Sequence, residues 1–309
     1  MRYSFTSTLS LALSLSPISG VWAQCRKLQF DGRIPNNFQV AQFDAANNIF
    51  NPKNVLGKDL AFSKILQLPK TSGSLFDNNG TQPLEVTIDD KSIFVPNADT
   101  VQNGFRRVEL LAASNSGTDD STKGVKTLHF SIAKDGQRAL NLTHEYQLVF
   151  LEDNSFSTNQ VVLKTGTVAG QNGGNPDTLQ LFGNVKESPP KVLFSTPFAA
   201  NGFHNFGITM DFNKNTVQVL FSTGAQPLKA VTQPIANDLS GGGQYHFGML
   251  KKGLGGGADI VRNGVQPAGI NEGLIYGGIF MEDSSTGCVS LAPQAKVAGR
   301  RCAEKRSLA

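Results

Sequence analysis

The 309-residue sequence has few of the residues on which several common kinds of protein chemistry depend. It has one tryptophan, three cysteines and four histidines, and charged residues make up 17% of it. The histidines show neither a His-x-His nor a His-Glu-x-x-His spacing, so we expect no metal site, and nothing in the sequence indicates a cofactor. The basic residues exceed the acidic ones only by 28 to 24 and are scattered. Neither nucleic acid nor an anionic membrane is therefore an expected partner.

Long apolar runs are also missing. No stretch approaches the roughly 18 apolar residues that a membrane-spanning helix needs. The short apolar run at 9–18 follows Arg2 and precedes Val21-Trp22-Ala23, a pattern typical of a cleaved secretory signal. We therefore expect residues 1–23 to be a signal peptide and the protein to be secreted to the extracellular space. Cleavage there would remove the single tryptophan.

The few cysteines fit an oxidising compartment. Cys25 and Cys288 are the expected disulfide pair, because they would tie the mature N-terminus to the last strand of the core. Cys302 lies in a segment without apolar periodicity, 293–309, which we expect to be a disordered tail. Asn79 and Asn141 begin Asn-x-Thr sequons and are predicted glycosylation sites.

What the sequence has in plenty is glycine and phenylalanine, with 32 and 21 residues. Alternation of apolar and polar residues with period two recurs along the chain and predicts strands. The segments that show it are 105–111, 126–132, 144–152, 204–212, 216–222, 244–250 and 273–281. Helix signals are scarce, and no linker divides residues 25–292. We expect one all-β domain there, a β-jelly roll or two-sheet antiparallel sandwich with few short helices, and a monomer.

The segment 144–152 illustrates the expected alternation. Strict period two would place Tyr146, Leu148 and Phe150 on one face of the strand. Glu145, Gln147 and Val149 would then lie on the other face.

Three of the predicted strands carry a pair of polar residues two positions apart, so both members of each pair point to the same face. Glu, Gln, Arg and His beside aromatic residues are more typical of a sugar-binding groove than of a solvated strand. The pairs are Arg107 with Glu109, Glu145 with Gln147, and Gln244 with His246, and Tyr245 would add an aromatic contact.

Hydrolysis of a glycosidic bond needs one protonated and one ionised carboxyl group. Arg107 would hold Glu109 ionised by charge pairing. Glu145 lies between aromatic and apolar neighbours, so a raised pKa and the acid role are expected for it. The pattern also fits a simpler interpretation, in which Glu109 and Arg107 form a solvated ion pair and His246 is a histidine at the edge of the core.

Segments along most of the mature chain resemble the fungal glycoside hydrolases of family 131. They are residues 31–35, 85–90, 104–110, 124–130, 144–148, 241–248 and 277–283. The resemblance implies a β-jelly roll that acts on β-1,3-, β-1,6- and β-1,4-linked glucans, as polysaccharide or oligosaccharide. It also implies that Glu109 and Glu145 are the functional carboxylates, with Arg107, Gln147 and His246 beside them.

A secreted, inverting β-glucanase is therefore the leading hypothesis, and two others stay open. A polysaccharide lyase on the same fold would use Tyr245 or His246 as the base and Arg107 to neutralise a uronate. A catalytically silent glucan-binding protein would use the same groove without turnover.

Overall fold

A computed structural model describes residues 25, 27–51, 60–77, 80–114, 116, 118–171 and 173–293. The predicted signal peptide, the tail beyond residue 293 with Cys302, and the sequon residue Asn79 lie outside the described residues.

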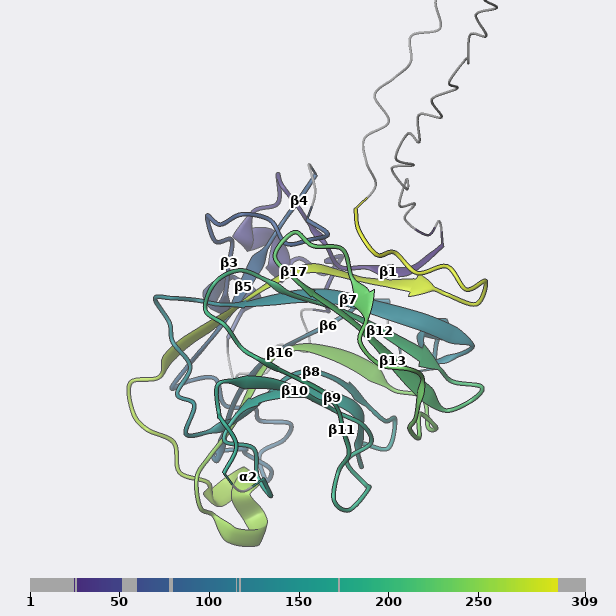
Figure 1. Ribbon diagram of the computed structural model, residues 1–309. Helices are drawn as coiled ribbons and strands as arrows, with labels where there is room; N and C mark the ends of the chain where they lie inside the picture. Colours follow the sequence, from purple (N-terminus) through teal and green to yellow (C-terminus); the bar gives the residue numbers. More distant parts are fainter. Residues whose placement is uncertain are drawn as a thin grey trace, which may run out of the picture.

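Two antiparallel sheets pack face to face (Figure 1). The larger has nine strands in the order β14-β13-β12-β7-β17-β5-β3, with β1 paired to β17 and β15 paired to β13. Their bounds are β1 Leu28–Asp31, β3 Leu66–Gln67, β5 Leu84–Asp89, β7 Val125–Lys134, β12 His204–Asp211, β13 Thr216–Thr223, β14 Lys229–Ala230, β15 Ile235–Ala236 and β17 Asn271–Asp283.

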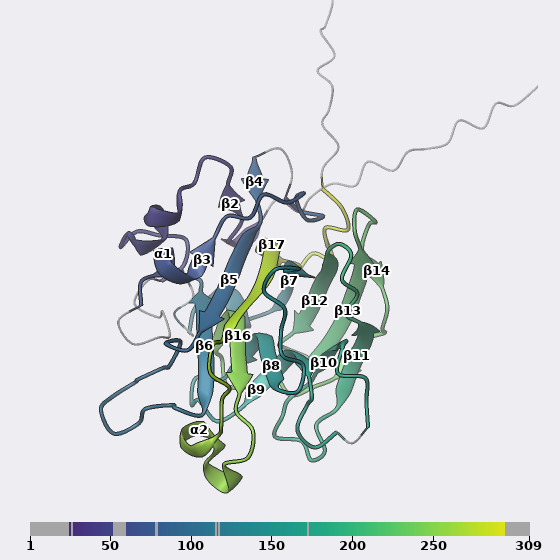
Figure 2. The same ribbon diagram turned by 90° about the vertical axis from the view of Figure 1, so that its left-hand side faces the viewer.

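The smaller sheet has six strands in the order β11-β10-β9-β8-β16-β6. They are β11 Val192–Pro197, β10 Thr178–Phe182, β9 Asn159–Gly166, β8 Glu145–Glu152, β16 Gln244–Lys252 and β6 Phe105–Leu111. Figure 2 shows β6, β16 and β8 next to one another. The predicted two-sheet β-sandwich is confirmed.

The remaining elements are short. β2 (Ile34–Pro35) and β4 (Thr81–Gln82) form a small pair. The helices described are α1 Phe62–Ile65, α2 Ile260–Asn263, and the 3-10 helices η1 Val40–Asp44, η3 Asp120–Thr122 and η4 Gly257–Asp259. None of the helices in the described part of the chain is long and apolar enough to cross a membrane.

Alternating side chains of both sheets fill the main core between them. β7 contributes Leu128, Phe130 and Ile132, all buried, as its period-two pattern predicts. From the facing sheet, β16 contributes Tyr245, Phe247 and Met249. The opposite face of the six-stranded sheet points away from this core, and we call it the outer face.

β8 does not keep strict alternation. Leu148 and Val149 both lie in the main core, whereas Phe150 belongs to a small cluster on the outer face with Val162 and Phe182. The register of β8 shifts against both neighbours, β16 and β9. Strict alternation predicts Phe150 on the face of Tyr146 and Leu148, and Val149 on the opposite face. Both of these predictions are therefore wrong. The irregularity exchanges the faces of the strand from Val149 onward.

Two residues stabilise this irregularity. The hydroxyl of Tyr276, on β17 of the opposite sheet, lies 2.7 Å from the carbonyl oxygen of Gly248 and 3.0 Å from that of Leu148. Gly248 has a φ of 156°, and a Cβ there would lie 2.1 Å from the carbonyl oxygen of Val108. A side chain at position 248 would therefore force β6 and β16 apart.

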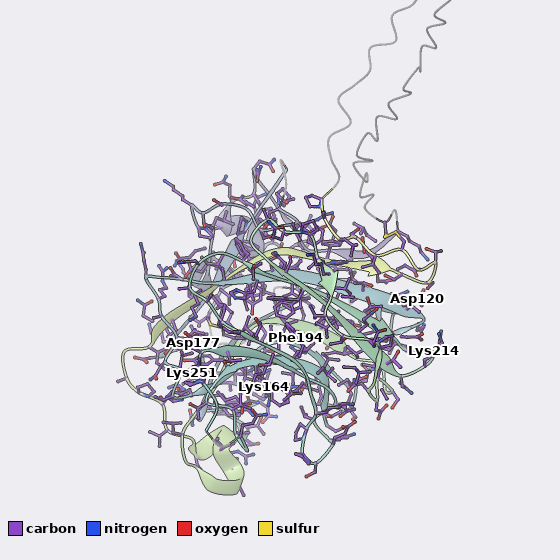
Figure 3. The ribbon with its side chains drawn as sticks, in the orientation of Figure 1. Asp120, Lys164, Asp177, Phe194, Lys214 and Lys251 are labelled. Carbon is purple, nitrogen blue, oxygen red and sulfur yellow. A yellow bond between two sulfur atoms is a disulfide. The ribbon has the colours of Figure 1, made fainter. Side chains whose placement is uncertain are left out.

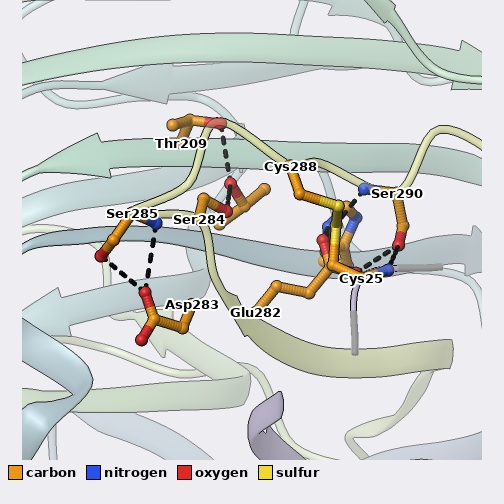
Figure 4. The surroundings of a disulfide bond; sticks show 10 residues. Cys25, Thr209, Glu282, Asp283, Ser284, Ser285, Cys288 and Ser290 are labelled. Atoms are coloured by element: carbon orange, nitrogen blue, oxygen red, sulfur yellow. Dashed lines mark hydrogen bonds and ion pairs between the residues drawn. A yellow bond between two sulfur atoms is a disulfide. The ribbon is translucent and has the colours of Figure 1, made fainter. Parts of the chain in front are cut away.

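The predicted disulfide between Cys25 and Cys288 is confirmed, with a Cα–Cα distance of 5.9 Å (Figure 4). It joins the start of the domain to the segment after β17 across a sequence separation of 263. In the chain-entropy model, a disulfide that closes a loop of this length stabilises the folded state by roughly 5 kcal/mol. Hydrogen bonds support it, because Ser290 accepts from the backbone of Cys25 at 3.1 Å and donates its own backbone N–H to Glu282 at 3.0 Å.

Replacing Gly248 by alanine should lower the free energy of unfolding by about 2 to 4 kcal/mol, because the new Cβ meets backbone atoms. Gly136→Ala is the matched control, since a Cβ there meets no atom within 4 Å. Urea denaturation of the two variants measures the difference. Equal stability of both would show that the strands can separate without cost.

Candidate functional site

The outer face of the six-stranded sheet carries the polar residues singled out from the sequence. Cross-strand pairing puts Arg107 opposite Leu250, and Glu109 opposite Gly248. His246 shares their face, because it is two residues from Gly248 on β16. Figure 1 shows the six-stranded sheet bent into an arch. Its outer face is the concave side of this arch. In Figure 3, Phe194 lies between the two sheets and Lys164 lies below the arch.

Glu109 is the most deeply buried carboxylate of this face, with a side chain that is 0% exposed. Arg107 donates to it twice, from Nε at 2.6 Å and from a terminal nitrogen at 2.7 Å. Nδ1 of His246 lies 2.7 Å from Oε2 of Glu109, the oxygen that also accepts from the terminal nitrogen of Arg107. Burial alone would raise the pKa of Glu109, but Arg107 and His246 outweigh it and lower the pKa to about 2. Glu109 therefore stays ionised, as the sequence predicts.

His246 connects Glu109 to a second carboxyl group. Its ring stacks on Phe150 with centroids 4.3 Å apart. Because the ionised Glu109 accepts a hydrogen bond, Nδ1 carries the proton, and a neutral ring then has its lone pair on Nε2. This nitrogen is buried, makes no hydrogen bond within the described residues, and lies 3.5 Å from Oε2 of Glu152.

Glu152 ends β8 and was not singled out from the sequence. Its side chain is 26% exposed, so it is accessible where Glu109 is not. Burial raises its pKa, the negative charge of Glu109 adds to this rise, and His246 opposes it. Strict alternation would have placed Glu152 on the face opposite Glu145 and Gln147. The register shift in β8 instead turns it beside His246, and the only signal in the sequence was its place at the end of a strand with other candidates.

Glu145 lies on the same outer face but in a separate cluster at the opposite end of β8. Its Oε1 lies 3.0 Å from Nζ of Lys164 and 2.7 Å from Nζ of Lys252, and its Oε2 accepts from the backbone of Ala169 at 2.8 Å. Burial would raise the pKa of Glu145, but the two lysines outweigh it and lower the pKa. The expectation that the pKa of Glu145 is raised is therefore wrong. From strand spacings, its Cα lies about 15 Å from that of Glu109.

The other predicted residues divide between the two faces. Gln147 pairs with Lys164 beside Glu145 and accepts a hydrogen bond from Asn159. Gln244 pairs with Glu152 at the far end of β16. Tyr245 is corrected: it lies in the core between the sheets, where its hydroxyl donates to the carbonyl of Ser121 at 3.0 Å. It cannot contact a substrate on the outer face.

Asn141 lies before the start of β8, with its Oδ1 accepting from Thr143. Glycosylation there stays a prediction. Among the described residues, no three His, Cys, Asp or Glu side chains are placed to hold a metal ion.

Residues 28–287 match the family described as "Glycoside hydrolase 131 catalytic N-terminal domain". This match covers most of the chain. The chain belongs to glycoside hydrolase family 131. The protein is therefore a glycoside hydrolase, and the sequence resemblance is confirmed. No curated protein matches the chain.

Two solved structures are similar to this hydrolase over nearly their full length. One is a GH131 β-glucanase catalytic domain from Podospora anserina, with 22% identity and a TM-score of 0.66, covering 86% of this chain and 98% of that one. The other is the catalytic domain of a family 131 protein from Coprinopsis cinerea, with 24% identity and a TM-score of 0.63, covering 86% and 97%. At these identities the likeness establishes the shared fold.

The lowered pKa of Glu109 predicts a specific dependence of stability on pH. The ionised form stabilises the fold above its unfolded pKa of about 4.5, by about 3 kcal/mol, and this contribution is lost as the pH falls towards 2. Glu109→Gln should therefore unfold more easily than the unchanged protein at pH 6, and the difference should shrink by pH 3. Urea denaturation across this range measures it. A difference that does not change with pH would contradict the assignment.

Proposed function

We propose that this protein is a secreted β-glucanase that cleaves β-1,3-, β-1,6- or β-1,4-linked glucans, with Glu152 as the acid. The ionised Glu109, acting through His246, provides the base. The family supports glycosidic hydrolysis, and the Podospora anserina relative is described as a β-glucanase. The disulfide between Cys25 and Cys288 supports an oxidising, extracellular location.

One observation carries the proposal: a single imidazole lies between two carboxyl groups whose pKa values are shifted in opposite directions. Glu109 is held ionised, whereas the pKa of Glu152 is raised. Environments that separate two carboxyl groups in this way divide the base and acid roles of a glycosidase. Of the two carboxyl groups, the proposed acid Glu152 is the accessible one.

The proposed reaction moves two protons. Glu152 gives its proton to the glycosidic oxygen as the bond from that oxygen to the anomeric carbon breaks. Water attacks the anomeric carbon from the opposite side, and Nε2 of His246 takes the proton that the water loses. Glu109 stabilises the imidazolium that forms. After the products leave, the proton returns from His246 to Glu152 across the 3.5 Å contact.

The burial of Glu109 favours inversion. Its side chain is 0% exposed and lies behind His246, so it cannot reach an anomeric carbon and form the covalent intermediate that retention requires. In this proposal a water that contacts Nε2 of His246 is therefore the nucleophile.

The two other hypotheses are less well supported. The lyase would have lost one of its two candidate bases, because Tyr245 is in the core. A silent glucan-binding protein would need no carboxyl group with a raised pKa beside a histidine. Release of reducing sugar from laminarin, lichenan or a soluble cellulose derivative separates hydrolysis from binding. An unsaturated product from a uronic polymer would instead support the lyase.

Glu152→Gln and Glu109→Gln should each lower kcat by about 10²- to 10⁴-fold on whichever glucan is cleaved, because each removes one side of the acid–base system. Glu145→Gln serves as the matched control and should retain far more turnover. Release of reducing sugar measures the three variants, with circular dichroism to confirm folding. A loss in Glu145→Gln as large as that in Glu152→Gln would restore the pair expected from the sequence.

The first product formed should have the inverted anomeric configuration. Proton NMR during the first minutes of hydrolysis of a β-linked oligosaccharide should therefore show the α-anomer before mutarotation. Early β-anomer would mean retention, and the proposed role of His246 as the route to water would then be wrong.

A further inference from the structure

The cluster around Glu145 has no part in the proposed reaction, yet it lies on the same outer face. Lys164 is 9% exposed and Lys252 is 24% exposed, and both ammonium groups contact the same carboxylate oxygen. Lys164 also lies over the ring of Phe182 at 5.0 Å. Two lysines that are partly or largely buried in one cluster are unusual, because lysine side chains are mostly exposed in proteins.

The position of the cluster suggests contact with the same polysaccharide chain. Lys252 lies eight residues from Gln244, the cross-strand partner of Glu152. At about 3.3 Å per residue, this is about 26 Å along β16. A glucan that runs along the arch from Glu152 would therefore reach the lysines after several sugar units.

The charge of the cluster is not balanced. Lys164 and Lys252 bring two positive charges, and Glu145 brings one negative charge. In the described part of the chain, the ion pairs of both lysines involve only Glu145. Burial lowers the pKa of Lys164, which reflects the cost of holding this charge away from water. A second anion beside the lysines would reduce that cost.

A small cavity of about 60 Å³ adjoins the cluster, lined by Gly166, Val168 and Gln180 among others. Gly166 pairs with Glu145, and Gln180 pairs with Lys164, so the cavity and the lysines share one end of the sheet. Oε1 of Gln180 is buried and makes no hydrogen bond to the described residues. It is therefore an acceptor suited to a sugar hydroxyl.

We propose that Lys164 and Lys252 bind the carboxylate of an acidic sugar unit in a β-glucan chain, with Gln180 accepting a hydrogen bond from one of its hydroxyls. The ligand class is a sugar carboxylate, found either as a gluconate chain end or as a glucuronosyl unit within the chain. This subsite rests on the proposed glucanase function, and it would direct the enzyme to oxidised stretches of its substrate.

The test compares three matched gluco-oligosaccharides within each of the β-1,3-, β-1,6- and β-1,4-linked series. One is oxidised to gluconate at its end, one is reduced there to an uncharged alditol, and a third carries an internal glucuronosyl unit. Calorimetry on the Glu152→Gln variant measures their Kd values without turnover. We expect the carboxylated ligands to bind about tenfold more tightly than the alditol, because a charged group adds a charge-assisted hydrogen bond.

Lys252→Met should remove this preference, so that the ratio of the two Kd values approaches one. Lys214→Met is the control, since Lys214 pairs with Asp211 at the end of β12 and should leave the ratio unchanged. The gluconate and glucuronosyl ligands distinguish the two sources of the carboxylate. The source is the one whose ligand binds more tightly than the alditol.

Equal binding of the alditol and both acidic ligands by the starting protein would overturn the subsite. Equal weakening of the binding of charged and uncharged ligands in Lys252→Met would also overturn it. Lys252 would then bind a neutral sugar or have a structural role. Failure of the glucanase proposal would look different. The unchanged enzyme would then release no sugar from any glucan, while the calorimetric comparison would still be decisive.

Discussion

The irregular register between β8 and its neighbours determines which side chains the outer face carries. Without it, Phe150 and Glu152 would point into the core between the sheets, and His246 would have neither a ring to stack on nor a second carboxyl group. Tyr276 reaches across the core to the two carbonyls at the irregularity, and Gly248 lets the strands approach there. The site on one sheet therefore depends on a hydroxyl supplied by the other.

The three glutamates of the outer face show how position sets chemistry. All three are partly or fully desolvated, which by itself would raise each pKa. Glu109 contacts a guanidinium and an imidazole, Glu145 contacts two ammonium groups, and Glu152 contacts only the edge of the same imidazole, with Arg107 acting on it from farther away. The pKa values consequently separate: those of Glu109 and Glu145 are lowered, and that of Glu152 is raised.

The sequence predicted the architecture well because period two is maintained in most strands. The alternation of Leu128, Phe130 and Ile132 correctly identified the core, and the spacing of Arg107 and Glu109 correctly indicated an ion pair on one face. The prediction failed where the alternation fails. No local pattern marked the shift in β8, since it depends on Tyr276, a residue more than a hundred positions away. Tyr245 was misplaced for a different reason, because an aromatic between two polar residues belongs to the opposite face of its strand.

The disulfide has a further consequence for the way the domain can be extended. Cys25 and Cys288 fix both described ends of the domain beside the nine-stranded sheet, next to β1 and β17, whereas the outer face lies beneath the other sheet (Figure 1). A module joined at either end would therefore begin on the side of the sandwich away from the arch. The enzyme could be immobilised or fused through both ends at once without covering the surface on which a polysaccharide would lie.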